Sequence, residues 1–449
     1  MNRRISHFLT EYGMIFVLLL LCAFFSVVTY SEQSPTGESA ARQLASDLLQ
    51  RPGKGGRVLI VVRPQADDAL FARALEQQLS AGGVRVAGVV SGEPKDARET
   101  LKKLAASGEK LDAIAGNQVT ASWLVFADLG ADFPALGNPR LVKPRSYMWP
   151  NFLKSENLLN IANQIAVIAI VAIGMTIVII TGGIDLSVGS LIALSAVLAA
   201  RFIRDYAGAL HATTLGMTAA CVVAVLLCGL VGFFSGGMVT LCDIPPFIVT
   251  LAMMLVASGL AYLLAQGQSI YQAPDSFVWL GRGANFLGIP NAVLLMLALY
   301  AAAHVLMSRM KLGRYIYAVG GNREAARLSG VPVHGVLLFA YAASGVLAGL
   351  GGVVTASQLK SGSPTYGAMY ELYVIAAVVV GGTSLSGGEG KMLGTLIGAF
   401  TIAVIQNGMN LTNVESYTQK VVLGLVILAA VVLDTLRHRK WGGGSAVRV

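Results

Sequence analysis

The sequence is poor in charged residues, which make up 13% of its 449 positions. Soluble globular chains average about 25%, so a string of ordinary soluble domains is excluded. The charges are also unevenly spread, because residues 31–150, called the insert below, carry 28 of the 57. Outside the insert long apolar runs dominate, and hydrophobic residues reach 55% of the chain. The composition therefore predicts an integral membrane protein with one soluble insert.

Missing features exclude several kinds of site. The net charge of +9 is not gathered into a basic patch, and nucleic-acid binding needs such a patch. No Gly-x-x-x-x-Gly-Lys-Ser/Thr phosphate-binding loop occurs, so the chain itself is not an ATPase. The four cysteines and five histidines lack metal-site spacing. We therefore expect no catalytic residue, metal or cofactor in this chain.

The insert carries the pattern of a small α/β domain. Strands are predicted at Arg57–Val62, Val84–Val90 and Leu111–Ala115, and helices at Ala66–Leu79 and Lys95–Ala106. Strands alternating with helices of this length indicate βαβ units and a parallel sheet.

Ten apolar segments have lengths suited to a membrane span, although 187–202 and 372–384 are short. An even number places both termini on one side, and Lys/Arg outside the insert and its neighbour Lys154 then divide 12 against 5. Positive charge marks the cytoplasmic side, which predicts cytoplasmic termini, a cytoplasmic tail at 438–449 and an extracytoplasmic insert. No small-x-small cleavage site follows the first span, so it is predicted to remain uncleaved. The expected spans are 14–30, then, within a permease core at 151–437, 161–181, 187–202, 213–236, 246–266, 291–308, 336–356, 372–384, 392–411 and 418–436.

A glycine-rich break separates two of these segments, from Gly182 to Gly189. Gly182 and Gly183 can end one helix, and Asp185 or Ser187 can cap the next by accepting its free N–H groups. Polar backbone is not tolerated against lipid, so the break is expected to face protein or a water-filled cavity. Two interpretations remain open, a direct role in transport and an ordinary cytoplasmic turn.

A second glycine motif follows about 200 residues later, with Gly381, Gly382, Ser384, Ser386 and Gly387. In the predicted topology both motifs follow an apolar run that travels inward. Weak internal symmetry of this kind is typical of transporters built from repeats.

A third motif lies in the loop from Lys311 to Val331. Asn322 can cap a short helix that runs to Ser329, and Gly330 can stop it. Small side chains at Ala325 and Ala326 would let a partner surface approach closely. The alternative is that the flanking basic residues only anchor the loop at the membrane face.

Taken in order, the three motifs resemble those of the permease subunit of bacterial ABC sugar importers of the ribose/xylose/galactoside class. The resemblance covers residue 151 to about residue 439 and the first helix. It implies a dimer of permeases, two cytoplasmic ATP-binding subunits that hold ATP and Mg, and an extracytoplasmic solute-binding protein. It also implies that segment 323–330 is a coupling helix that docks on the ATPase. The residues expected at that contact are Asn322, Arg323, Glu324, Ala325, Ala326, Arg327, Ser329 and Gly330.

The insert departs from this class, whose members pass from the first helix to the core through a short link. The stretch from Val90 to Asn117 resembles part of one lobe of a type I periplasmic sugar-binding protein. Because a complete binding protein closes two lobes around its ligand, we expect either a docking platform for a separate binding protein or a lobe of structural use.

Two groups of residues are candidates for a substrate path. Tyr366, Tyr370, Glu371 and Tyr373 cluster where an outer loop meets a span, and aromatic rings beside a carboxylate suit sugar stacking. Tyrosines of the membrane interface are the alternative. Gln406 and Asn410 lie one helical turn apart, either lining a pore or hydrogen-bonding between helices.

The fold class expected is an all-α polytopic membrane protein of about ten transmembrane helices with a small α/β extracytoplasmic insert. Its expected function is the import of a monosaccharide such as ribose, xylose or galactose across the cytoplasmic membrane, with ATP hydrolysed by a partner. A related importer of nucleosides or amino acids is one alternative. A membrane receptor is another, against which stands the lack of a cytoplasmic kinase, cyclase or coiled coil. An ion-coupled carrier is less favoured, because ionisable groups are scarce within the spans.

Overall fold

The computed structural model describes residues 3–441, with side chains from residue 13 to residue 432. Residues 442–449 of the predicted tail lie outside the described part of the chain. The described residues divide into two compact units, residues 30–150 and the rest. Each unit is described by itself below, and the second is called the membrane unit.

The insert is a parallel α/β domain. Within its described residues the main sheet has the order β3-β2-β4-β5, with all neighbouring pairs parallel. Side chains of strand β2 alternate between two apolar clusters, one on each face of the sheet. The strands are β2 (Arg57–Val62), β3 (Arg85–Ser91), β4 (Ala113–Gly116) and β5 (Arg140–Val142).

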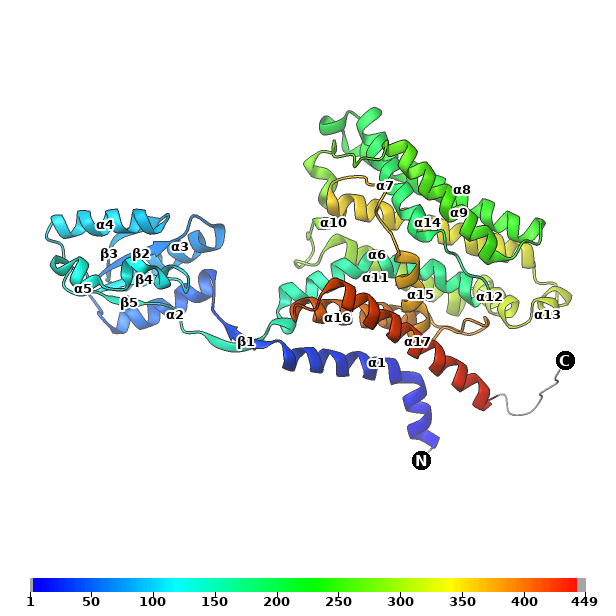
Figure 1. The fold of residues 1–449 in the computed structure, drawn as a ribbon, viewed down its shortest axis with the longest axis horizontal. Helices are drawn as coiled ribbons and strands as arrows, with labels where there is room; N and C mark the ends of the chain where they lie inside the picture. The colour runs from blue at the N-terminus through cyan, green and yellow to red at the C-terminus, as the bar shows by residue number, and fades with distance from the viewer. Residues whose placement is uncertain (1–2, 442–449) are drawn as a thin grey trace. The chain divides into compact units, whose positions relative to one another are not determined.

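Helices cover both faces of this sheet (Figure 1). Helices α2 (Gly37–Gln50) and α3 (Ala66–Ala81) pack on one face, and α4 (Pro94–Ala106) packs on the other. The predicted strands and helices lie within two residues of their observed bounds, whereas α2 and β5 were not predicted. A short antiparallel pair joins the two ends of the insert. The remaining elements are β1 (Tyr30–Gln33), β6 (Tyr147–Pro150), α5 (Leu129–Asp132) and the 3₁₀ turns Thr120–Ser122, Leu124–Phe126 and Pro134–Leu136.

The membrane unit is helical, and each predicted span overlaps a helix, although the predicted span 372–384 runs past the end of α15 at Val380. Among the described residues, α6, α8, α9, α11, α14 and α16 are long and apolar enough to cross a bilayer. Shorter apolar segments lie in α1, α15 and α17, and three of the last five residues of α7 are charged, so the count of ten spans stays a prediction. The helices are α1 (Arg3–Val28), α6 (Ser155–Ile180), α7 (Val188–Asp205), α8 (Thr214–Leu241), α9 (Pro246–Ala265), α11 (Asn291–Arg309), α14 (Val333–Leu359), α15 (Tyr370–Val380), α16 (Met392–Leu411) and α17 (Ser416–Trp441).

Short helices lie in the connections of the membrane unit. They are α10 (Trp279–Arg282), α12 (Lys311–Gly321) and α13 (Arg323–Leu328), with 3₁₀ turns at Asn151–Leu153, Ala209–His211 and Asp275–Val278.

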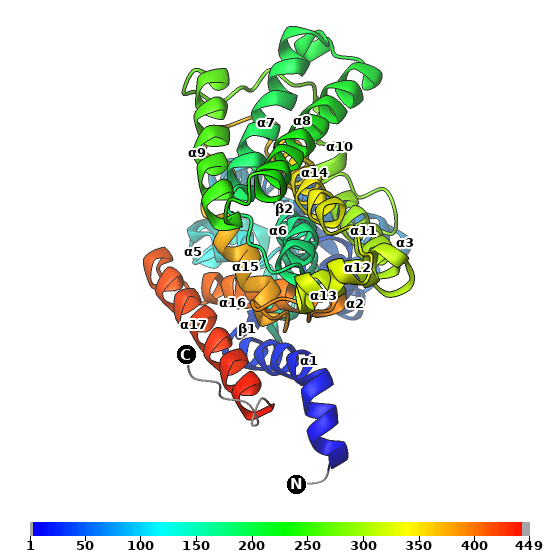
Figure 2. The same ribbon diagram turned by 90° about the vertical axis from the view of Figure 1, so that its right-hand side faces the viewer.

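Helix α6 forms the centre of the membrane unit. It is buried along most of its length and contacts α11, α14, α15 and α16, as Figure 2 shows. Helix α14 lies beside it and packs closely on α8 through glycines. A Cβ at Gly232 of α8 would overlap the carbonyl of Tyr341, and one at Gly345 of α14 would overlap the carbonyl of Cys228. Small residues let membrane helices approach in this way.

Candidate functional site

The first glycine motif is a tight turn between α6 and α7. Gly182 has a left-handed backbone (φ +80°), which glycine adopts at no steric cost. Its N–H donates to Ile179 O at 2.9 Å, and Gly183 N–H donates to Val178 O at 3.0 Å. This pair of bonds is the Schellman motif that ends a helix. The prediction that glycines end α6 therefore agrees with the observed turn.

Asp185 in this turn is 1% exposed and bound on both carboxylate oxygens. Oδ1 accepts from the backbone N of Ser187 at 3.0 Å and from its hydroxyl at 2.6 Å. Oδ2 accepts from the hydroxyl of Ser344 on α14 at 2.7 Å. A buried carboxylate needs such donors to offset its lost hydration.

Of the two residues expected to cap α7, Asp185 accepts from the backbone N–H of Ser187, the residue just before the helix, whereas Ser187 does not cap it with its side chain. Its backbone is helical (φ −77°, ψ −14°), and its side chain accepts no capping bond from the described residues of the first turn. The hydroxyl instead donates to Asp185 Oδ1. Gly189, also predicted here, lies in the first turn of α7, where a Cβ would overlap the carboxylate of Glu371.

The second glycine motif forms the same turn after α15. Gly382 has φ +87°, its N–H donates to Val379 O at 2.9 Å, and Thr383 N–H donates to Val378 O at 3.2 Å. The rest of the motif forms a loop closed by its own bonds, in which Ser386 N donates to the buried Ser384 hydroxyl at 3.3 Å. Gly381 is the C-cap of α15 and directly precedes Gly382, the residue with the left-handed backbone.

The two turns and the end of α12 meet at one place, called the glycine junction (residues 180–182, 320–321 and 387–388). Gly388 N donates to Ile180 O at 2.9 Å. A Cβ at Gly387 would lie 3.1 Å from Gly182 N and 3.0 Å from Gly320 O. A Cβ at Gly320 would overlap the carbonyl of Ile180. The sequence marks the three motifs separately, but contact between them depends on tertiary packing that no local pattern encodes.

Helix α13 follows directly from this junction. Asn322 Oδ1 accepts from Ala325 N at 2.9 Å, which is the predicted N-cap. The helix ends at Leu328, one residue before the predicted end at Ser329. Gly330 (φ +80°) closes it, with its N–H donating to Arg327 O and the next N–H to Ala326 O, both at 3.0 Å.

The surface of α13 differs from expectation at two positions. Ala326 is 5% exposed and packs into the membrane unit, so it is not available to a partner as predicted. Ala325, Arg323, Glu324 and Arg327 are exposed, and Glu324 pairs with Arg327 at 3.0 Å. Leu328, which was not predicted, is 84% exposed. The sequence offers one signal for the exposure of Leu328: α13 has only six residues, and Ala326 is the one that faces the membrane unit.

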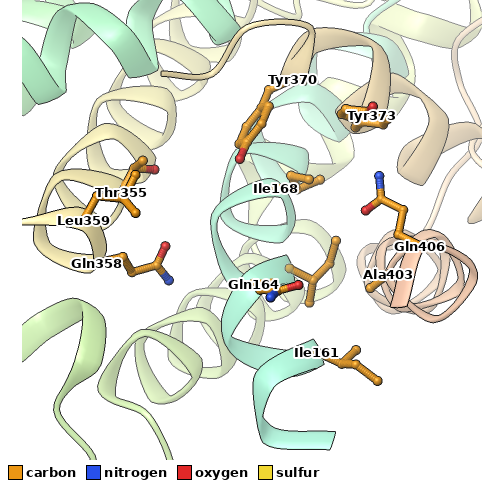
Figure 3. Close-up of a pocket in the computed structure, with 11 residues that line it drawn as sticks. Ile161, Gln164, Ile168, Thr355, Gln358, Leu359, Tyr370, Tyr373, Ala403 and Gln406 are labelled. Carbon is orange, nitrogen blue, oxygen red and sulfur yellow. The ribbon is translucent and has the colours of Figure 1, made fainter. Parts of the chain in front are cut away.

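A cavity of about 290 Å³ lies between α6, α14, α15 and α16. Figure 3 shows Gln164, Gln358 and Gln406 around one space, each from a different helix, with Tyr370 and Tyr373 above them in that view. Thr355 adds a hydroxyl, and Gln358 Nε2 donates to the carbonyl of Asn163 at 3.0 Å. The lining residues are Ile161, Gln164, Ile165, Ile168, Thr355, Gln358, Leu359, Tyr370, Tyr373, Ala403 and Gln406.

The predicted substrate-path residues fall in different places. Tyr370, Tyr373 and Gln406 line the cavity. Tyr366 instead bonds the hydroxyl of Ser361, and Glu371 lies against α7. Asn410 is exposed and accepts from Gln419 Nε2 of α17 at 2.8 Å. Gln164 and Gln358 were missed, although each is a primary amide within an apolar segment.

The architecture is that of a helical membrane protein with a cavity inside its bundle of apolar helices. A family model described as "Branched-chain amino acid transport system / permease component" matches residues 157–431. That is more than half of the chain, and the match begins after the insert. The chain belongs to this family of transport-system permeases.

Three relatives show where in the family it lies. The ribose import permease of Escherichia coli strain K12 is 43% identical over 65% of this chain and 90% of its own length. The ribose import permease of Bacillus subtilis strain 168 is 43% identical over 67% and 91%. The L-arabinose permease of E. coli strain K12 is 36% identical over 65% and 86%. These matches confirm the resemblance to permeases of ABC sugar importers. No solved structure matches the chain.

Proposed function

We propose that this protein is the transmembrane subunit of an ATP-driven importer that carries a monosaccharide across the cytoplasmic membrane. The observation that carries the proposal is the polar cavity within the helical bundle. The amides of Gln164, Gln358 and Gln406 each offer donors and an acceptor, which is what neighbouring sugar hydroxyls need. The rings of Tyr370 and Tyr373 add flat apolar surface suited to the C–H face of a sugar.

Energy is supplied through α13. The chain has no phosphate-binding loop, so ATP and Mg belong to a separate cytoplasmic subunit. The exposed face of α13 carries Arg323, Glu324, Arg327 and Leu328, which is an apolar side chain surrounded by charges and suits a protein partner. Its position beside the glycine junction links that partner to both glycine turns.

The remaining partners follow from the topology predicted by charge. The insert lies outside the cytoplasm and meets a separate solute-binding protein. A second permease subunit, taken to be another copy of this chain, completes the path through the bilayer.

The test is uptake by the assembled complex. The tagged protein is purified from its native membrane in mild detergent, its companions are identified, and the complex is reconstituted in vesicles. We expect a companion with a phosphate-binding loop, and ATP-dependent uptake of labelled ribose, xylose or galactose. An oligomer without an ATPase companion that accumulates none of these sugars with ATP would contradict the proposal.

Branched-chain amino acids are the second candidate substrate, favoured by the description of the matching family model. The cavity offers aliphatic side chains, from Ile161, Ile165 and Ile168, as well as amides from three helices, so its lining alone does not separate the two candidates. Competition by unlabelled leucine in the same uptake assay decides between them. We expect leucine to leave sugar uptake unchanged.

A further inference from the structure

Asp185 joins the first glycine turn to a helix far away in the sequence. Its Oδ2 holds the hydroxyl of Ser344, which is fully buried on α14. The turn is also held by α9, where the hydroxyl of Thr250 donates to Ile184 O at 3.2 Å. The hydrogen bond from Ser344 is thus a side-chain link between α14 and this turn.

Helices α6 and α14, which meet at this turn, also line the cavity. A Cβ at Gly174 of α6 would lie 2.7 Å from the Cα of Ser344, and one at Gly351 of α14 would lie 2.9 Å from Val171. Farther along, Gln358 of α14 bonds Asn163 of α6. Helices α6 and α14 thus pack side by side from the turn to the cavity. A change in their relative position moves Gln164 against Gln358.

Helix α13 is connected to both sides of this contact. It follows α12, whose Gly320 is fitted against the carbonyl of Ile180 at the end of α6. It is followed by α14, which begins at Val333. Helix α13 thus connects the end of α12, which touches α6 at the junction, to the start of α14.

A second hydroxyl on α14 faces the same turn and is unused. Tyr341 is fully buried, and its hydroxyl has no hydrogen-bond partner among the described residues. The hydroxyl lies against Gly183, two residues before Asp185, since a Cβ on that glycine would overlap it. A buried hydroxyl without a partner is costly. Tyr341 and Ser344 are three residues apart, so they lie on one face of α14 about 4.5 Å apart along its axis.

We propose that Asp185 is a two-position latch. In the arrangement described here its carboxylate holds Ser344, and in a second state of the transport cycle it holds Tyr341 instead, after α14 has shifted against the end of α6. Asp185 is then a positioning residue, which acts on the cavity through α14. The inference rests on the proposed function, since ATP-driven transport supplies the cycle.

The decisive variant is Tyr341→Phe in the reconstituted complex. It removes a hydroxyl that makes no bond in this arrangement, so thermal stability is expected to be unchanged or higher. Because the second state loses its partner, sugar taken up per ATP hydrolysed is expected to fall about tenfold, within the range for coupling residues. The matched control is Tyr300→Phe, since the buried Tyr300 hydroxyl donates to Ala169 O at 3.0 Å. That variant is expected to lower stability and leave sugar per ATP unchanged.

A second pair of variants tests the arrangement seen here. Ser344→Ala removes the bond to Asp185, whereas Ser195→Ala removes an equally buried serine bond, from α7 to Gly349 O of α14 at 2.7 Å. Only Ser344→Ala is expected to lower sugar per ATP. Normal sugar per ATP in Tyr341→Phe, beside a working wild type, would overturn the latch and leave the importer standing. A wild-type complex without ATP-driven uptake would overturn the importer, and the latch with it.

Discussion

Gly388 donates its backbone N–H to the carbonyl of Ile180 at 2.9 Å, and so ties the second glycine turn to the end of α6. The two turns come from distant parts of the chain and end their helices with the same pair of hydrogen bonds. Gly320 is wedged between them at the end of α12. The end of α12, which leads into α13, therefore touches both turns through backbone atoms, which cannot adjust as a flexible side chain does.

Gly320→Ala is expected to disrupt the glycine junction. The added methyl would overlap the carbonyl of Ile180, and overpacking of this kind costs about 1–3 kcal/mol or more. The control is the adjacent Gly321→Ala, where a Cβ would meet nothing within 4 Å. Thermal unfolding of the purified protein and uptake in vesicles measure the effect. Equal stability and uptake in the two variants would show that the close approach has no consequence.

Leu328→Asp is expected to release the ATPase companion without unfolding the protein. The side chain is 84% exposed, so the free permease loses little, whereas a docked apolar residue at the centre of an interface is worth about 2 kcal/mol or more. The control is Leu124→Asp on the insert, where the leucine is 89% exposed. The measurement is the amount of ATPase that co-purifies. Full retention with Leu328→Asp would place the docking surface elsewhere.

Gln164→Leu is expected to weaken sugar binding. It replaces an amide that lines the cavity with an apolar side chain of similar size, and an unmatched sugar hydroxyl costs about 1–3 kcal/mol. The KM for uptake is then expected to rise about tenfold or more. Gln419→Leu is the control, because Gln419 bonds Asn410 and Val414 O away from the cavity. An unchanged KM in Gln164→Leu would remove the cavity from the substrate path.

Local signals account for the parts of this structure that a sequence can predict. Asn322 and Gly330 mark the bounds of α13, and Gly182 and Gly382 mark the ends of α6 and α15, because a cap or a left-handed residue is needed there whatever surrounds it. In the insert, the alternation of short apolar strand segments with amphipathic helical segments predicts β2, β3 and β4. The cavity carries no such signal. Gln164 and Gln358 meet only once α6 and α14 are packed together.

The wrong predictions for Ala326 and Ser187 also have their cause in tertiary packing. Ala326 and Leu328 are two residues apart on α13, and only the packing of the loop sets which of them faces inward. Ser187 has the residue type of an N-cap, but the buried carboxylate of Asp185 takes its hydroxyl instead. In both cases a tertiary contact outweighs a local preference.

An acid-dependent weakening is expected in the insert, where Asp68 bonds Arg63. Burial alone would raise the pKa of Asp68, but the hydrogen bonds and the charge of Arg63, with Nε at 2.9 Å, outweigh it and lower that pKa. A carboxyl whose pKa is lowered by folding stabilises the fold above its unfolded pKa, about 3.9. That stabilisation is lost as the pH falls through the folded pKa.

Asp68→Asn in the full chain is therefore expected to cost about 1–2 kcal/mol at pH 7, since a charged hydrogen bond is lost. It is also expected to flatten the fall in stability below about pH 4. Hydrogen exchange of strand β2, read by mass spectrometry across pH, reports this on the intact protein. The neighbouring Asp67→Asn is the control, because Asp67 is exposed. If both variants keep the pH dependence of the wild type, the acid response of the insert comes from other carboxyl groups, and the Arg63 pair contributes nothing measurable to it.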